Sequence, residues 1–313
     1  MKPSRRKGRS VNGVLLLDKP EGSSSNAVLQ QVRRLYGAAK AGHTGSLDPL
    51  ATGMLPICFG EATKFSQYLL NADKRYRVIA KLGEKTTTGD AEGEVIKQCH
   101  PVLVSDEQIE QVVRRFIGPI EQVPPMYSAL KHQGQPLYKL ARKGIDIERR
   151  ARTITIYSLD WCRVDIDHIE MTVHCSKGTY IRSLVEDIGE VLGCFAHVKV
   201  LRRLQVGSFA GDMLSLEQLR EVSESDGVDT LDQYLLPVDV TLCAYSCIVL
   251  DEKTAAVFYQ GQGVNWVTSI DIPLGLVQVW SGRGEQKEKF IGVGEWVSGG
   301  RLLPRRLIRH DET

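Results

Sequence analysis

Two stretches of this chain alternate apolar and polar residues, and this pattern limits most strongly how the chain can fold. In residues 75–82 and 169–176 every second side chain is apolar, which predicts strands that bury only one face. Helical spacing follows Ser25, Ser105 and Thr179. Strands and helices do not alternate in the regular rhythm of a parallel sheet, so we expect the α+β class rather than a doubly wound sheet.

The composition is that of an ordinary globular protein and excludes several classes. Of the 313 residues, 42% are hydrophobic and 25% are charged, and no apolar run approaches the roughly 20 residues that cross a bilayer. No apolar signal segment follows the basic N-terminus, so we expect a cytoplasmic protein with no membrane partner. Seven scattered cysteines without a C-x-x-C pair, and histidines without H-x-x-x-H spacing, predict no disulfide framework and no metal site.

Charge is unevenly distributed along the chain, although the net charge is only +2. The first ten residues carry five positive charges and no negative one, and residues 131–152 carry seven basic residues against two acidic ones. Residues 212–252 carry ten acidic residues against Arg220 alone. This segregation is compatible with a basic face that binds a polyanion, and equally with solvated helix faces and an unstructured N-terminal arm.

The densest candidate for a functional segment is the glycine- and proline-punctuated stretch 42–56, which we expect to form a loop. Asp48 lies at its centre and is followed by Pro49, which stiffens the backbone. A carboxylate held in such a loop can act as a nucleophile or base, but it can also be an ordinary turn residue. The stretch contains neither G-x-x-x-x-G-K-[ST] nor G-x-G-x-x-G, so it is not a nucleotide phosphate loop.

Seven further residues are candidates whose types alone leave two interpretations open. A tyrosine at the start of a strand, an arginine in the first turn of a helix, and a Lys-Pro turn each occur in purely structural roles. The same residue types can also stack on a base, bind an anion or support a loop. These residues are Lys19, Pro20, His43, Tyr76, Tyr180, Arg182 and Leu201.

Four segments, taken together, resemble the TruB-type bacterial tRNA pseudouridine-55 synthases. They are residues 12–20, the 42–56 stretch, residues 75–78 and residues 177–182, in the order that the family has them. The 42–56 stretch is highly specific for the family, whereas the tyrosine and arginine segments are persuasive only jointly. The resemblance extends essentially from end to end of the chain.

This resemblance implies a pseudouridine-synthase fold, with a central mixed, largely antiparallel sheet flanked by helices. It divides the chain into a catalytic domain, residues 1–250, and a small β-rich PUA-like domain, residues 251–313. The catalytic domain would begin with a basic arm over residues 1–10. A thumb-like insertion that clasps RNA is expected at about residues 118–152, projecting from the core.

The resemblance also implies a role for each candidate residue. Asp48 matches the essential aspartate, and Arg182 matches the arginine that pairs with it and would keep it ionised by lowering its pKa. Tyr76 matches the tyrosine that stacks on the target base and helps with proton removal. The remaining matches are His43, which packs against T-loop RNA; Tyr180 and Leu201, which line the uridine pocket; and Lys19 and Pro20, which support the active-site loop.

The implied activity is the isomerisation of uridine 55 in the tRNA T-loop to pseudouridine, by base flipping, cleavage of the glycosidic bond and C1′–C5 rejoining. This reaction needs no cofactor and no metal. We expect a monomer that contacts the T-arm and acceptor stem of tRNA without a guide RNA. Whether Asp48 attacks C1′, attacks the base or removes the C2′ proton stays open. The alternatives are an RNA-binding protein without catalysis, a guide-dependent pseudouridine synthase, and a phosphate-binding hydrolase.

Overall fold

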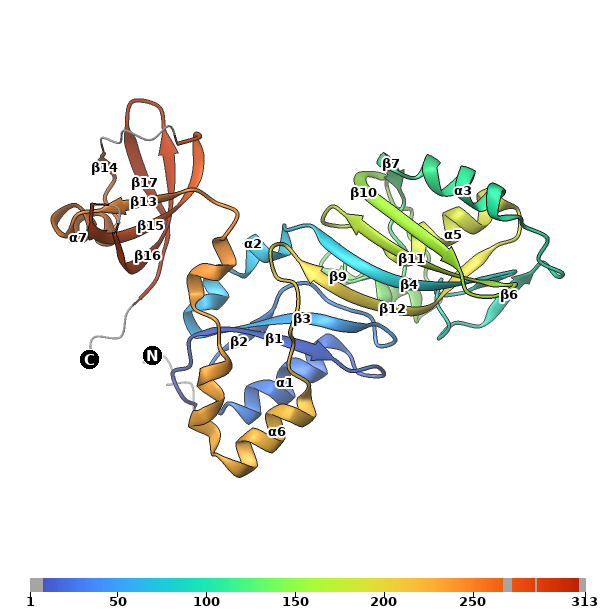
Figure 1. Cartoon of the computed structure of the whole chain (residues 1–313), viewed down its shortest axis with the longest axis horizontal. Coiled ribbons are helices and arrows are strands. Elements are labelled where there is room, and N and C mark those ends of the chain that lie inside the picture. Colours follow the sequence, from blue (N-terminus) through green and yellow to red (C-terminus); the bar gives the residue numbers. More distant parts are fainter. Residues whose placement is uncertain (1–7, 267–271, 285, 310–313) are drawn as a thin grey trace.

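The computed structural model describes residues 8–266, 272–284 and 286–309. Figure 1 shows a large sheet with its helices and, at the other end of the molecule, a smaller β-rich body. The strands of the large sheet are β1 (Gly13–Lys19), β2 (Ala41–His43), β3 (Thr52–Phe59), β4 (Lys74–Leu82), β7 (Gly118–Gln122), β10 (Arg152–Arg163), β11 (His168–Cys175) and β12 (Ala196–Val206). They are ordered β1-β3-β12-β4-β11-β10-β7, with β2 paired to β3. Of these pairings, only β3 with β12 is parallel, which confirms a mixed, largely antiparallel sheet in an α+β fold.

Four helices pack on the large sheet, each through one apolar stripe. Those helices are α1 (Ser25–Leu35), α3 (Asp106–Arg115), α5 (Ile181–Leu192) and α6 (Leu216–Ser225). Ser105 and Ser215 begin α3 and α6 with capping boxes, and Gly193 ends α5 in the left-handed conformation. Apolar residues of α3 and α5 pack into one cluster with β4 and β11, and those of α1 and α6 into another with β1 and β3.

Shorter elements connect these layers or lie at their margins. They are the hairpin strands β5 (Glu84–Thr86) and β6 (Val95–Gln98), the hairpin strands β8 (Lys131–His132) and β9 (Gln135–Pro136), the helices α2 (Ser66–Leu70) and α4 (Leu137–Ala141), and the 3-10 helices η1 (Gly60–Lys64), η2 (Val228–Tyr234) and η3 (Val238–Leu242). Among the residues described, no helix combines the length and the apolar character needed to cross a membrane.

The second sheet has five strands and packs against the large body. It consists of β13 (Cys247–Leu250), β14 (Val264–Asn265), β15 (Gly275–Arg283), β16 (Gln286–Val297) and β17 (Arg301–Leu307), with α7 (Glu252–Tyr259) against it. The strand order is β13-β15-β16-β17-β14. The boundary expected at residue 250 therefore falls at the end of the first strand of this sheet. Phe290 of β16 lies against Phe65, with ring centroids 5.6 Å apart.

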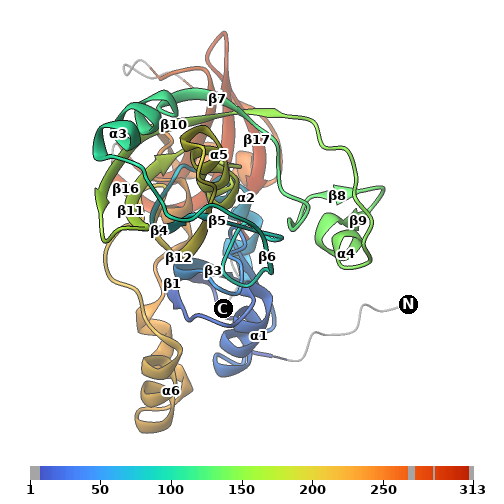
Figure 2. The ribbon, with the colours of Figure 1, turned by 90° about the vertical axis from the view of Figure 1, so that its right-hand side faces the viewer.

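Two expectations from the sequence need correction. The 42–56 stretch is not a loop throughout, because Thr52–Phe59 forms strand β3, which is almost entirely buried. The 118–152 segment is not all insertion, because β7 pairs with β10 at the edge of the large sheet. The part that projects from the body is 123–151, which carries β8, β9 and α4 (Figure 2). We call residues 123–151 the insertion from here on.

Candidate active site

Asp48 lies in the segment that connects β2 to β3, and a buried lysine holds this segment. Lys19, at the end of β1, is fully buried. Its Nζ donates to the carbonyl oxygens of Pro20 (2.9 Å), Pro49 (3.2 Å) and Ala51 (2.6 Å). All three ammonium protons are therefore used on carbonyl groups, two of which follow Asp48 closely in the loop.

Further contacts fix the same loop from its other side. Ser25 Oγ donates to the Leu47 carbonyl (3.0 Å) and accepts from the Leu47 N–H (2.7 Å). Arg203 of β12 donates from Nε to the carbonyl of Met54 (2.7 Å) and from Nη2 to that of Gly45 (3.1 Å). The backbone on both sides of Asp48 is thus bound to side chains of other elements, which places the carboxylate with little freedom.

Arg182, the second residue of α5, pairs with Asp48. Its Nε lies 2.9 Å from Asp48 Oδ2 and 3.6 Å from Asp90 Oδ2. Nη1 donates to the Thr88 carbonyl (2.7 Å) and Nη2 to the Tyr127 carbonyl (2.6 Å). The guanidinium is buried and is oriented by all these groups together, so it presents Nε to Asp48 in a fixed direction.

Arg182 lowers the pKa of Asp48, as expected, but the net shift of this pKa is upward. Burial among protein atoms raises this pKa, the charge and hydrogen bond of Arg182 lower it, and the charge of Asp90 raises it again. Burial has the largest effect, so the net shift is upward. The Asp48 side chain nevertheless keeps 40% of its surface exposed, which leaves it open to a substrate.

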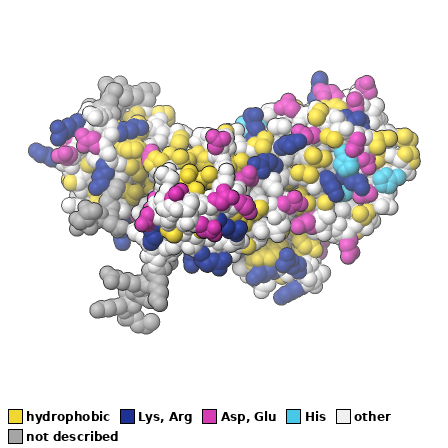
Figure 3. Space-filling model, turned by 60° about the horizontal axis from the view of Figure 1, so that its bottom comes forward, with side chains coloured by type: hydrophobic (Ala, Val, Ile, Leu, Met, Phe, Trp, Pro, Cys, Tyr) yellow, Lys and Arg dark blue, Asp and Glu magenta, His cyan; other side chains and the backbone are white. Residues whose placement is uncertain are grey.

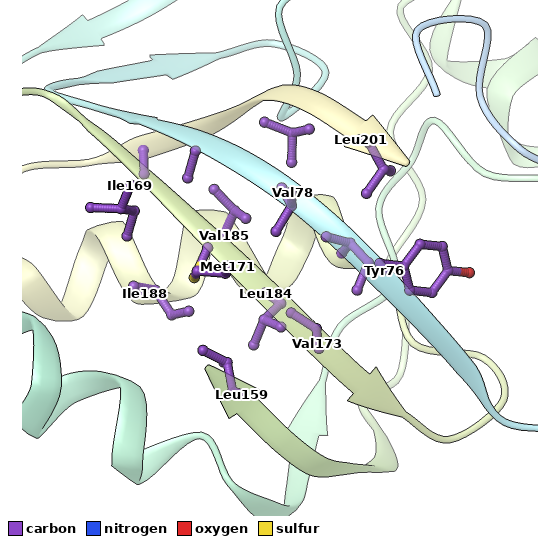
Figure 4. Packing of buried hydrophobic residues seen from close by; sticks show 14 of the residues in the cluster. Tyr76, Val78, Leu159, Ile169, Met171, Val173, Leu184, Val185, Ile188 and Leu201 are labelled. Carbon is purple, nitrogen blue, oxygen red and sulfur yellow. The ribbon is translucent and has the colours of Figure 1, made fainter. Parts of the chain in front are cut away.

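Tyr76 and Leu201 lie beside this carboxylate on neighbouring strands. They belong to one buried cluster with Leu47 and Leu50 of the Asp48 loop. Figure 4 shows the Tyr76 ring at the end of the row of buried residues, with its hydroxyl pointing away from them. Burial raises the pKa of Tyr76, and Arg203, its cross-strand neighbour, offsets part of this shift. The phenol is therefore protonated at neutral pH.

Tyr180 and His43 lie in the segments that carry Arg182 and Asp48. Tyr180 immediately precedes α5, and the guanidinium of Arg152 lies over its ring, 5.1 Å from the centroid. His43 ends β2, and its Nδ1 is buried without a hydrogen-bond partner in the part of the chain that the structure describes. Burial and the charge of Arg203 lower the pKa of His43, so its ring is neutral at pH 7.

Among the predicted residues, Arg182 thus pairs with Asp48, Lys19 binds the segment that carries Asp48, and Tyr76 and Leu201 share a buried cluster with Leu47 and Leu50 of that segment. Pro20 accepts a hydrogen bond from Lys19, and Tyr180 and His43 lie in the segments that carry Arg182 and Asp48. Sequence reasoning missed two participants. One is Arg203, among the largest fully buried side chains. The other is Asp90, whose Oδ1 accepts from Thr88 Oγ1 (2.5 Å) and from the Glu92 N–H (3.1 Å). An aspartate in a short polar loop predicts such a turn, but not its approach to Arg182.

The charged segments of the sequence can be located in the structure, and one basic residue of the N-terminal arm lies against the acidic segment. Acidic side chains gather on the face that Figure 3 shows, which is the α6 side of the molecule. Arg9, from the basic arm, lies 2.7 Å from Asp229 and 2.8 Å from Asp232, so it pairs with two residues of the acidic segment. The other basic residues of the arm lie outside the described residues. In the insertion, Lys139 and Lys143 are exposed and form no ion pair within the described ranges.

Metal-ligating residue types approach one another elsewhere in the described chain. Asp165 and Asp167 lie between β10 and β11, His168 begins β11, and the ligand atoms of all three fall within 4.8 Å of one another. His168 Nδ1 is 3.0 Å from Asp165 Oδ1 and 2.7 Å from Asp167 Oδ1. These groups satisfy one another and share no residue with the Asp48 site.

Comparison with known families covers nearly all of the chain. Residues 33–181 match the model described as "TruB family pseudouridylate synthase (N terminal domain)". Residues 182–243 match the "tRNA pseudouridylate synthase B C-terminal domain", and residues 246–308 match "Pseudouridine synthase II TruB, C-terminal". The break between the last two matches precedes the second sheet.

Full-length relatives and solved structures agree with these matches. A protein of an Enterobacter species named tRNA pseudouridine synthase B is 53% identical over 98% of both chains. One of the same name from Tolumonas auensis is 55% identical, covering 97% of this chain and 94% of that protein. A chain from a solved Cbf5-Nop10-Gar1 complex superimposes with a TM-score of 0.71 and 27% identity, covering 92% of this chain and 79% of that one.

Proposed function

This chain belongs to the TruB family of pseudouridylate synthases, and from that premise we propose that it isomerises uridine 55 in the T-loop of tRNA to pseudouridine. The observation that carries the proposal is the Asp48 carboxylate, bound to Arg182 at 2.9 Å yet 40% exposed. A carboxylate that is held in place and still accessible can react with a bound nucleotide.

The reaction rearranges bonds without a net gain or loss of electrons. The C1′–N1 bond of uridine breaks, the base turns, C1′ joins C5, the proton on C5 leaves and N1 becomes protonated. The balance requires neither an oxidant nor a metal. We propose Asp48 as the group that starts the reaction, by attack on C1′, by attack on the base, or by removal of the C2′ proton.

The walls of the site suit a flipped-out base. A nucleotide in a folded loop must leave its stack to reach Asp48, and an aromatic or apolar surface replaces the original stacking. We propose that Tyr76 stacks on the base while Tyr180 and Leu201 line the pocket, and that His43 packs against the loop RNA. Tyr76 is our candidate for the C5 proton. Because its phenol is protonated, it can accept this proton only as part of a relay that passes its own proton on.

The remaining parts of the chain supply candidate contacts to tRNA. We propose a catalytic domain over residues 1–250 and an RNA-contacting, PUA-like domain over residues 251–313 that reaches the acceptor stem. The exposed lysines of the insertion would contact phosphates of the T-arm, which positions RNA without reading its sequence. We expect a monomer that uses this protein clasp in place of a guide RNA. The seven free cysteines fit the reducing cytoplasm, where we place it.

Tritium release from tRNA that carries tritium at C5 of uridine tests the proposal. Formation of the C1′–C5 bond expels this hydrogen to water, so the purified protein should release tritium and an Asp48→Asn variant should not. Asp226→Asn, at the exposed end of α6, is the matched control and should react as the wild type does.

Two outcomes contradict this assignment. One is tRNA binding by the wild type without tritium release, which favours an RNA-binding protein without catalysis. The other is equal release by the wild type and the Asp48→Asn variant, which removes Asp48 from the chemistry.

A further inference from the structure

The two strands that lead into and out of the insertion face each other directly at its base. Gln122 is the last residue of β7, Arg152 is the first residue of β10, and their Cα atoms are register partners. Both side chains reach the same short segment, residues 178–183, which carries Tyr180 and Arg182.

Gln122 binds the backbone of Tyr180 twice. Its Oε1 accepts from the Tyr180 N–H (2.8 Å), and its Nε2 donates to the Tyr180 carbonyl (3.0 Å). The Gln122 side chain is buried, with the residue 1% exposed. Tyr180 is the N-cap of α5, and its own side chain makes no capping hydrogen bond. The amide of a residue far away in sequence therefore fixes the residue at which α5 begins.

Other contacts join the same two segments. Arg152 lies over the Tyr180 ring and donates from Nη2 to the carbonyl of Gly178. In the insertion itself, the Tyr127 carbonyl accepts from Arg182 (2.6 Å) and the Val123 carbonyl accepts from Ser183 Oγ (3.4 Å). Gln122, Arg152 and the insertion thus make contacts along residues 178–183, where α5 starts.

The backbone groups of Tyr180 depend on the side chain of Gln122 for hydrogen bonds. Removal of Gln122 would leave the Tyr180 N–H without its partner, while the Tyr180 carbonyl would keep only the bond from the Leu184 N–H (3.1 Å). An unsatisfied N–H beside the buried position of Gln122 costs free energy, which a shift of the backbone can relieve. Tyr180 is the N-cap of α5, and Arg182 follows it by two residues. A shift at Tyr180 therefore moves the guanidinium that meets Asp48.

We propose that Gln122 is a positioning residue for the isomerisation, which fixes Tyr180 and the start of α5 so that Arg182 meets Asp48. This role rests on the proposed function. Gln122 and Arg152 connect the ends of the insertion to the segment that carries Tyr180 and Arg182. RNA bound to the insertion is therefore held in a fixed position relative to the reacting groups.

The test compares Gln122→Met, which keeps the volume of the side chain and removes both hydrogen bonds, with Glu121→Gln. Glu121 is the adjacent strand residue, is exposed, and its carboxylate accepts from Thr153 Oγ1 instead. The readouts are the single-turnover rate of tritium release, the Kd for tRNA and the thermal unfolding midpoint. We expect Gln122→Met to slow release by ~10–100-fold, since small misplacements of catalytic groups cost this much, while Kd stays near the wild-type value. Glu121→Gln should match the wild type in both.

A second variant, Gln122→Glu, keeps the test decisive if the methionine variant does not fold. A protonated glutamic acid can accept from the Tyr180 N–H and donate to its carbonyl, whereas an ionised one can only accept. The rate of this variant relative to the wild type should therefore rise as pH falls. A ratio that does not change with pH, or a methionine variant slowed only in proportion to a higher Kd, overturns the proposal. Absence of release from the wild type contradicts the proposed function instead.

Discussion

Lys19 places an ammonium group in the protein interior, and this has a consequence for stability. Burial lowers its pKa from 10.5 to about 8, an effect that Asp48 and Glu92 partly offset. The unfolded chain therefore binds more protons than the folded one between pH 8 and 10.5. Stability contributed by this residue rises with pH across that window, because the cost of burying the charge disappears.

A Lys19→Met variant tests this linkage. The free energy of unfolding of the wild type, minus that of the variant, should increase between about pH 8 and pH 10 by at most about 3 kcal/mol. The variant should also release tritium more slowly, because the carbonyls of Pro49 and Ala51 no longer have their donor. Urea unfolding at both pH values measures the first effect. Lys253→Met, at an exposed position of α7, is the control, and the same pH dependence in both variants would contradict the argument.

The charge of Asp90 should affect the pH below which activity is lost. Asp48 must be ionised to act, so the rate falls as pH drops through its pKa, and Asp90 raises that pKa. In an Asp90→Asn variant the acid limb of the rate of tritium release should move to lower pH. In an Arg182→Gln variant the acid limb should move to higher pH, because Arg182 no longer lowers the pKa of Asp48. An acid limb that stays in place in both variants would rule out this electrostatic coupling.

Residue roles could be predicted from the sequence only where a local motif carried them. The 42–56 stretch pointed to Asp48, and the match to a family added Tyr76 and Arg182. Gln122 and Arg203 carry no such signal, since each is a buried polar residue whose partners lie 58 and 149 or more residues away. Hydrogen bonds of this kind are fixed by strand register, which a single sequence does not contain.

Among the elements, the sequence predicted strands β4 and β11, which bury one face, but it did not predict strand β3, which is buried on both faces. The alternating pattern identified β4 and β11 because one face packs on α5. Strand β3 reads Met54 to Phe59 as an almost unbroken apolar run, because it is covered on both faces, and its glycine and proline residues indicated a loop.

Gly53 is the residue that allows β3 to lie against β12. Its φ is +95°, and a Cβ at this position would stand 2.3 Å from the carbonyl oxygen of Arg203. Gly53→Ala should therefore lower the free energy of unfolding by more than about 1 kcal/mol. Gly42→Ala is the control, because its Cβ would meet nothing within 4 Å. Thermal and urea unfolding compare the two, and equal stability would contradict the close packing.

For the whole molecule, net charge is a poor guide to RNA binding because opposite charges occupy different places. Lys139 and Lys143 are exposed on the projecting insertion without ion-pair partners in the described ranges, whereas Arg9 is paired with Asp229 and Asp232. Replacing both lysines by glutamine should make the plot of log K against log salt shallower, by about one unit for each phosphate that a lysine no longer neutralises. Arg9→Gln should leave the slope unchanged. Filter binding across a salt series measures both slopes, and the opposite ranking would contradict the arrangement.

The aromatic contact between Phe65 and Phe290 belongs to a buried cluster that includes Val14 and Met54 from the large sheet and Val293 from the small one. Neither sheet can come apart without exposing part of the other's interior. Heating should therefore produce one calorimetric peak in place of two. A molecule that binds only the small sheet should raise the melting temperature at which the Asp48 loop unfolds.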